Sequence, residues 1–137
     1  MVYALLPNKN QQTYLKLFEF LFSFIETCPK SVMVDFEKAI HNALTKMAKK
    51  KFDLELLIQG CYFHLVSNLW KHVQACHLVE KYSECKDFRK LYKLTKALSF
   101  LPPKHSIQGF EEIKAICNSD FQPILDYFEE YYIGKLF

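Results

Sequence analysis

The residues that decide the fold are Ser31-Val32-Met33-Val34-Asp35-Phe36-Glu37-Lys38-Ala39-Ile40. The apolar residues 32–35 predict a short buried strand, and residues 36–49 predict the helix that follows it. About twenty residues later, Leu56-Leu57-Ile58-Gln59-Gly60-Cys61-Tyr62-Phe63-His64 predicts a second strand running into another helix. Because two strands joined by a helix pair in parallel, we expect Asp35, Cys61 and His64 at the same carboxyl edge. That edge is where α/β sheets carry their chemistry.

The remaining segments are mostly helical in pattern. Residues 2–6 predict a strand, residues 10–26 a helix capped by Asn10, and residues 54–59 the full extent of the strand before Gly60. Further helices are expected over residues 63–82, from Cys85 to the Pro102-Pro103 stop, and over 106–117 and 120–133, with Ser106 and Asp120 as N-caps. The order β-α-β-α-β followed by helices predicts an α/β chain with a mostly helical C-terminal half.

Composition narrows the classes of protein that fit. The chain has 137 residues, of which 50% are hydrophobic, so it can bury one core and is not of the disordered class. Its net charge of +3 is too weak to indicate nucleic-acid binding by itself. Five irregularly spaced cysteines do not form a disulfide framework and favour an intracellular compartment. No secretory signal is visible, and the most apolar window, residues 14–25, is too short and too charged to span a membrane.

One basic cluster stands out, formed by Lys46, Lys49, Lys50 and Lys51. Lysines near the end of a helix complement its macrodipole and remain solvated, and this is the interpretation that we favour. The alternative is that these lysines contact the phosphates of a nucleic acid.

Three residues are candidates for site chemistry. Asp35 is a possible metal ligand, and by its position it is also a candidate N-cap of the helix over residues 36–49. Cys61 and His64 are half of a zinc ligand set, for which Cys76-His77 is the only nearby second half. Neighbouring residues of a helix point about 100° apart, so we favour local packing of Cys61 and His64 over zinc binding. With three glycines the chain has no phosphate-binding loop, and it has no recognisable nucleophile motif.

Several motifs together resemble the MULE transposase domain, the transposase of Mutator-like DNA elements. They occur in the order and approximate spacing of that family: Tyr3-Ala4-Leu5-Leu6-Pro7, Asp35-Phe36-Glu37-Lys38-Ala39, Gly60-Cys61-Tyr62-Phe63-His64, Ala97-Leu98-Ser99-Phe100-Leu101-Pro102-Pro103 and Tyr127-Phe128-Glu129-Glu130-Tyr131-Tyr132-Ile133.

The resemblance implies a nuclear enzyme that acts on DNA. Residues 1–65 would belong to an RNase H-like core, and residues 66–137 to the helical insertion of that core. Such transposases use a DDE triad of carboxylates with two Mg²⁺ or Mn²⁺ ions to cut DNA and join the ends to a target. Asp35 matches the second Asp of the triad and would be catalytic and a metal ligand, while Cys61 and His64 match a Cys-x-x-His signature near the active site.

The same resemblance implies that two parts of the site are missing from these residues. The family's first Asp precedes the position of residue 1, and its final Glu lies in an Asn-Asn-x-x-Glu-like helix after the position of Phe137. Glu111, Glu112, Glu129 and Glu130 lack that context and read as solvated helix faces. We therefore expect an inactive fragment with an incomplete RNase H-like sheet. The alternatives are a non-catalytic DNA- or protein-binding module and, less favoured, a small zinc-stabilised module using Cys61 and His64; the oligomeric state is left open.

Overall fold

The computed structural model describes residues 3–134 and is mixed α/β, 67% helical with one small sheet. The chain divides into two units between His64 and Leu65. The first holds α1 (Gln11–Phe22), β1 (Ser31–Val34), α2 (Lys38–Phe52), β2 (Leu57–Gly60) and the start of α3 (Tyr62–Ala75). The second holds the rest of α3 and the elements α4 (Val79–Glu84), α5 (Lys86–Ala97), η1 (Leu98–Phe100), α6 (Pro103–Ile116), α7 (Gln122–Phe128) and η2 (Glu129–Ile133).

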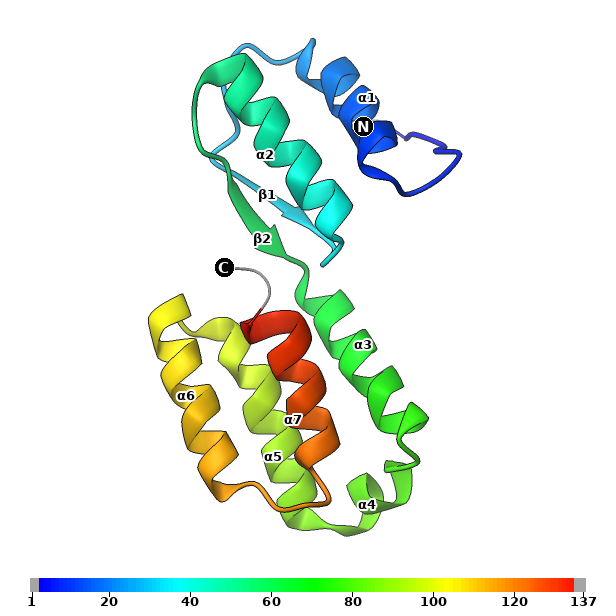
Figure 1. The fold of residues 1–137 in the computed structure, drawn as a ribbon, viewed down its shortest axis with the longest axis vertical. Coiled ribbons are helices and arrows are strands. Elements are labelled where there is room, and N and C mark those ends of the chain that lie inside the picture. The colour runs from blue at the N-terminus through cyan, green and yellow to red at the C-terminus, as the bar shows by residue number, and fades with distance from the viewer. Residues whose placement is uncertain (1–2, 135–137) are drawn as a thin grey trace. The chain divides into compact units, whose positions relative to one another are not determined.

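The sheet of the first unit confirms the predicted parallel pairing. β1 and β2 run in register from Ser31 opposite Leu57 to Val34 opposite Gly60, with α2 as the crossover between them (Figure 1). One face of the sheet packs against the hydrophobic core through Val32, Val34 and Ile58. The side chains of Met33 and Leu57 on the opposite face are 66% and 60% exposed. The sheet is thus covered on one side within its unit.

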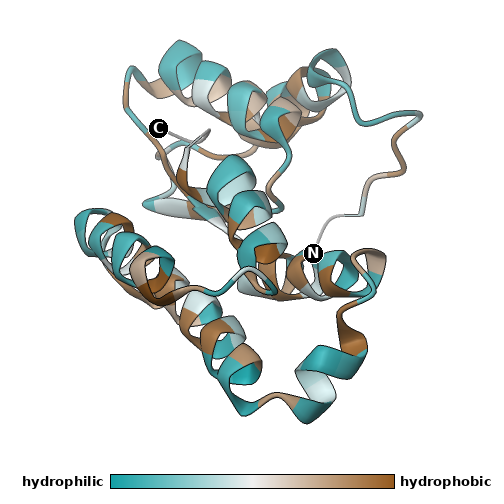
Figure 2. Cartoon of the chain, turned by 60° about the horizontal axis from the view of Figure 1, so that its bottom comes forward, coloured by the Kyte–Doolittle hydropathy of each residue, from teal (hydrophilic) through white to brown (hydrophobic). Residues whose placement is uncertain are grey.

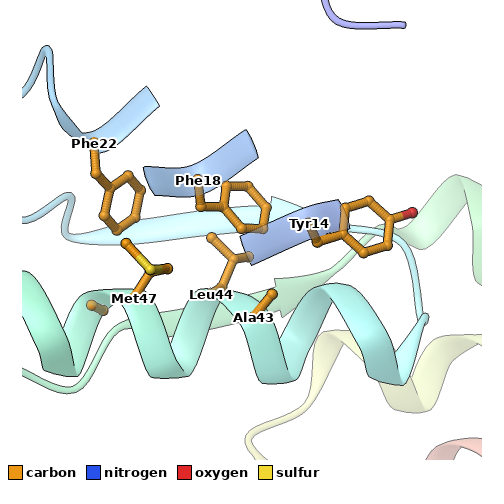
Figure 3. Packing of buried hydrophobic residues seen from close by; sticks show 7 residues of the cluster. Tyr14, Phe18, Phe22, Ala43, Leu44 and Met47 are labelled. Carbon is orange, nitrogen blue, oxygen red and sulfur yellow. The ribbon is translucent and has the colours of Figure 1, made fainter. Parts of the chain in front are cut away.

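The core of the first unit lies between α1 and α2. Tyr14, Phe18 and Phe22 recur every four residues of α1, which places their rings in one row over α2 (Figure 3). They meet the buried side chains of Ala43, Leu44, Met47 and Ala48. The Asn10 side chain accepts a hydrogen bond from the backbone N–H of Thr13 at 2.8 Å, so its predicted role as the N-cap is confirmed.

Several predicted boundaries in the first unit are wrong. Residues 3–6 are not a strand, and Val2 of that prediction lies outside the described residues. α1 ends at Phe22, four residues early, and the second strand begins at Leu57. α2 begins at Lys38, with Glu37 as its N-cap residue, because the Asp35 carboxylate accepts a hydrogen bond from the adjacent Phe36 N–H instead of from a helical turn.

The second unit is a set of amphipathic helices with an aromatic core. Trp70, Tyr82 and Tyr92 bring α3, α4 and α5 together through edge-to-face rings, with centroids 5.0 to 6.1 Å apart. Phe88 packs on Phe121 in the same way, at 4.9 Å. Figure 2 shows that the helices carry both hydrophilic and hydrophobic residues, as expected for amphipathic helices.

Helix boundaries in the second unit also differ from the predictions. The helix expected over residues 63–82 is two helices, because His77 adopts a left-handed conformation with φ of 56° between α3 and α4. α6 begins at Pro103 and not at Ser106, whose hydroxyl donates to backbone carbonyls. The N–H of Phe121 is accepted by the Asn118 side chain, so Asp120 is not the cap of α7. None of the helices described over residues 3–134 is long and apolar enough to cross a membrane.

Candidate functional site

Asp35 and His64 meet at the carboxyl edge of the sheet. Asp35 follows the last residue of β1, and His64 lies in the first turn of α3, just after β2. The Oδ2 atom of Asp35 is 3.8 Å from Nε2 of His64, and the two side chains are 32% and 46% exposed. The contact is an ion pair when His64 carries a proton. The edge predicted from the sequence therefore exists and is open to solvent.

Hydrogen bonds to backbone carbonyls fix the segments that carry Asp35 and His64. The N–H of Cys61 donates to the carbonyl of Val34 at 2.8 Å, which continues the sheet one residue past β2. The Nε2 atom of His41, on the first turn of α2, lies 3.1 Å from the carbonyl oxygen of Asp35. Asp35 therefore follows a residue fixed in the sheet, its own carbonyl contacts His41, its Oδ1 atom accepts from the Phe36 N–H, and its Oδ2 atom faces His64.

The end of β2 also requires a glycine. A Cβ atom on Gly60 would come within 2.6 Å of the Phe36 ring, so this ring lies against the bare Cα of Gly60. Phe36 sits between Asp35 and Glu37 in the chain. Gly60 therefore allows the segment that carries both carboxylates to lie close over the end of the sheet.

A second carboxylate beside the edge is already engaged. Glu37 accepts a hydrogen bond from Lys9 Nζ at 2.6 Å and another from the Tyr14 hydroxyl at 2.7 Å. These two hydrogen bonds, that of Lys9 first, lower the pKa of Glu37. Burial, followed by the hydrogen bond to Glu37, raises the pKa of Tyr14. The hydrogen bond to Glu37 likewise raises the pKa of Lys9. Glu37 therefore acts as the anion that joins α1 to the start of α2.

The donor set at this edge does not complete a two-metal site. Within residues 3–134, no group of three or more His, Cys, Asp or Glu side chains is arranged to hold a metal ion. Two-metal phosphoryl transfer requires several converging carboxylates, and here Asp35 is available while Glu37 is held by Lys9 and Tyr14. Asp35 can supply one ligand to a cation, and His64 can exchange a proton with a group bound there.

The other two candidate zinc ligands, Cys76 and His77, lie just after α3, in the second unit. Cys76 pairs instead with His72, one turn earlier on α3, with 3.5 Å between Sγ and Nε2. His77 occupies the left-handed break after that helix. All five cysteines are free thiols.

The predicted basic cluster on α2 is largely used within its own unit. Lys49 pairs with Asp53 at 2.6 Å and Lys50 with Glu19 at 2.9 Å. Lys51 Nζ donates to the carbonyl of Phe22, the last residue of α1, and, at 2.6 Å, to that of Ile25, three residues beyond it. Among the described residues, Lys46 is the one of the four whose ammonium makes neither an ion pair nor a hydrogen bond.

The late glutamates lie in the second unit, Glu111 and Glu112 on α6 and Glu129 and Glu130 on η2. Glu129 binds Lys114 through both oxygens at 3.1 Å, and this hydrogen bond raises the pKa of Lys114. Glu112 accepts from Gln108 at 3.3 Å on the exposed side of α6. These contacts are those of helix surfaces, as the sequence predicted.

Sequence reasoning missed four residues of the edge: Lys9, Tyr14, Glu37 and His41. Glu37 carried a signal, because it lies two residues after Asp35 in the same turn. Lys9 and Tyr14 are 28 and 23 residues from Glu37, and no local pattern links them.

Comparison of the chain with protein-family models, with curated proteins and with solved structures gave no match. The fold and the edge define the chain as a mixed α/β protein with a parallel strand pair and an Asp–His contact at its carboxyl edge.

Proposed function

We propose that residues 1–137 are the part of a MULE-type DNA transposase that contains Asp35, the second carboxylate of the DDE triad. In the complete enzyme this carboxylate would bind Mg²⁺ or Mn²⁺ for DNA cleavage and strand transfer in the nucleus. The observation that carries the proposal is the location of Asp35, directly after β1 at the carboxyl edge and facing His64 at 3.8 Å.

The bare face of the sheet supports an incomplete RNase H-like core. Parallel strands are normally buried on both faces, yet Met33 and Leu57 are largely exposed. The sheet of the described residues has two strands, whereas a sheet that is stable by itself usually has at least three. Further strands beside β1 would give the Asp35 strand its neighbours, the helices that connect them would cover the exposed face, and additional carboxylates would reach the same edge.

The same geometry implies that residues 1–137 bind a cation weakly. Mg²⁺ keeps most of its waters and is fixed by several anionic ligands, whereas this edge offers one available carboxylate. Cleavage would require two more carboxylates. The chain by itself would then be a cation- and DNA-binding piece without turnover.

Paramagnetic line broadening by Mn²⁺ tests the role of Asp35. In a two-dimensional amide spectrum of the chain, we expect low-millimolar Mn²⁺ to broaden the signals of Asp35, Phe36, Cys61 and His64. This broadening should disappear in Asp35→Asn. If Mn²⁺ broadens the same signals equally in the native chain and in Asp35→Asn, Asp35 is rejected as a metal ligand.

Asp53→Asn is the matched control. Asp53 is an exposed carboxylate at the end of α2, with φ of 55°, a conformation that Asn adopts easily. This variant should keep the broadening at the carboxyl edge. Loss of edge broadening in both variants would mean that Mn²⁺ follows net charge and not a site.

A further inference from the structure

A second cationic surface lies on α5, in the second unit. The helix reads Lys86-Asp87-Phe88-Arg89-Lys90-Leu91-Tyr92-Lys93-Leu94-Thr95-Lys96-Ala97, with five basic residues and one acidic residue. Phe88, Leu91, Tyr92 and Thr95 are buried. At 100° per residue, Lys86, Lys90 and Lys93 occupy the face opposite this buried stripe, and all three are exposed. We call Lys86, Lys90 and Lys93 the α5 lysine row.

The charges of the α5 lysine row are available. None of the three lysines makes an ion pair or hydrogen bond with another residue in the described part of the chain. The other basic side chains of α5 are engaged: Arg89 donates to the carbonyls of Tyr82 and Ser83 at the end of α4, and Lys96 lies 4.8 Å from the centre of the Tyr92 ring. These contacts fix the helix and leave the row facing solvent.

The two basic surfaces of the chain differ in this respect. Lys86, Lys90 and Lys93 line a shallow hollow of about 610 Å³ on α5, and Lys46, Lys49 and Lys50 line one of about 570 Å³ on α2. On α2, Lys49 and Lys50 are neutralised by Asp53 and Glu19. On α5, Asp87 is the one acidic residue of the helix, and among the described residues it forms no ion pair with Lys86, Lys90 or Lys93. An anionic partner therefore gains more from α5 than from the similar hollow on α2.

We propose that the α5 lysine row binds the phosphate backbone of a nucleic acid. From Lys86 to Lys93 the helix rises ~10.5 Å, at ~1.5 Å per residue, which equals the rise of about three base pairs along the axis of a DNA duplex, at ~3.4 Å of axis per phosphate of one strand. A membrane surface fits less well, because interfacial helices present large apolar side chains beside their lysines. Here the large apolar side chains of α5 are in the core except for Leu94, which is 37% exposed, and the other exposed apolar side chain is the small Ala97.

The binding would be electrostatic and independent of base sequence, since lysines contact phosphates as point charges. It deepens the proposed function by assigning a DNA-contacting surface to the helical half, and rests on that function only for the choice of DNA as the nucleic acid. It uses neither Asp35 nor a divalent cation.

The test is fluorescence anisotropy with a 20-base-pair duplex in EDTA, at several salt concentrations, on the full chain. The variant Lys86→Gln/Lys90→Gln/Lys93→Gln should bind at least about tenfold more weakly at low salt, and its salt slope should be smaller by ~2 to 3, as three lost phosphate contacts require. The matched control Lys46→Gln/Lys49→Gln/Lys50→Gln removes the same charge and should change affinity less than about threefold, because two of its lysines are already paired.

Equal weakening of both variants would overturn the proposal, because affinity would then follow net charge. Unchanged binding of the α5 variant, or no binding by the native chain, would also overturn it. Adding the duplex to the native chain provides a readout that needs no variant: amide shift changes should concentrate on residues 86–97. Shift changes confined to residues 42–50 would reject the α5 surface.

Asp35→Asn and lipid vesicles complete the experiment. Asp35→Asn should bind the duplex like the native chain, so failure of Asp35 as a metal ligand and failure of the α5 surface are distinguishable.

The chain should bind vesicles that contain phosphatidylserine more weakly than it binds the duplex at equal salt. Stronger binding to vesicles, lost in the α5 variant, would assign the surface to membranes and overturn the proposal.

Discussion

At the scale of single residues, the carboxyl edge depends on how Glu37 is held by Tyr14 and Lys9. Because the pKa of Glu37 is lowered on folding, its contribution to the free energy of unfolding is present above its ordinary pKa of 4.5 and is lost as the pH falls through the lowered value. The pKa of Tyr14 is raised, so its contribution is present below its ordinary 10.0 and is lost as the pH rises through the raised value. The Glu37–Tyr14 contact therefore stabilises the fold most between these limits.

Tyr14→Phe tests this contact. We expect it to lower the free energy of unfolding by about 1–2 kcal/mol at pH 7, because it removes a hydrogen bond to a charged acceptor. The loss relative to the native chain should shrink as the pH falls below the ordinary pKa of Glu37 and this carboxylate becomes protonated. Urea unfolding followed by circular dichroism measures both. Tyr127→Phe is the control, since the Tyr127 hydroxyl has no hydrogen bond within residues 3–134, and an equal loss in both variants would show that the bond to Glu37 contributes nothing of its own.

Gly60 is the second residue on which the edge depends. In Gly60→Ala the new methyl group meets the Phe36 ring, which must move, and we expect a loss of about 1–3 kcal/mol from overpacking. The double variant Gly60→Ala/Phe36→Leu should recover part of this loss, since neighbouring changes are not additive.

Gly109→Ala is the matched control for Gly60→Ala. Gly109 lies within α6, where alanine favours the helix more than glycine does. The added methyl group would meet the flexible end of the Leu98 side chain. Thermal unfolding of the variants decides between the two positions. A Gly60→Ala variant as stable as Gly109→Ala would show that Phe36 moves aside at little cost.

At the scale of elements, the end of α2 supports the end of α1. Lys51 donates to two carbonyls at the C-terminal end of α1, where a helix leaves its last carbonyl groups unpaired. The lysines that the sequence assigned to the macrodipole of their own helix thus also serve a neighbouring helix.

Replacing Lys51 should be more costly than replacing a lysine of the same helix that faces solvent. We expect Lys51→Gln to lower the free energy of unfolding by about 1 kcal/mol, and Lys46→Gln to change it by less than about 0.5 kcal/mol. Urea midpoints with unchanged slopes would measure the difference. Equal midpoints for the two variants would show that the contacts of Lys51 contribute nothing measurable.

At the scale of the whole molecule, we expect residues 1–137 not to cleave DNA. One available carboxylate at Asp35 cannot hold two cations close together, and the late glutamates are on helix surfaces of the second unit. A nicking assay on supercoiled plasmid with Mg²⁺ or Mn²⁺, with Asp35→Asn beside the native chain, checks this. Metal-dependent nicking by the native chain that Asp35→Asn abolishes would mean that another acidic residue completes a working site.

Hydrophobic periodicity was sufficient for most of the fold. The stripe Ala43, Leu44 and Met47 on α2 and the parallel pairing of β1 with β2 follow from local pattern and from the chirality of crossovers. The same reasoning predicted that Asp35, Cys61 and His64 share an edge, because strand ends in a parallel pair meet there. Helix ends were less predictable, since a side chain such as Asp35 can bond its own backbone instead of capping a helix.

Only the tertiary structure determines which charged side chains have ion-pair or hydrogen-bond partners. Glu37 is bound by residues 23 and 28 positions away, and Lys50 by a glutamate 31 positions away, so nothing in the nearby sequence distinguishes them from Asp35 or Lys46. The α5 lysine row and the α2 cluster both consist of lysines, but the lysines of the row have no ion-pair or hydrogen-bond partners among the described residues. Ion pairs between distant segments depend on distances that close when the core packs, and core packing depends on tertiary structure.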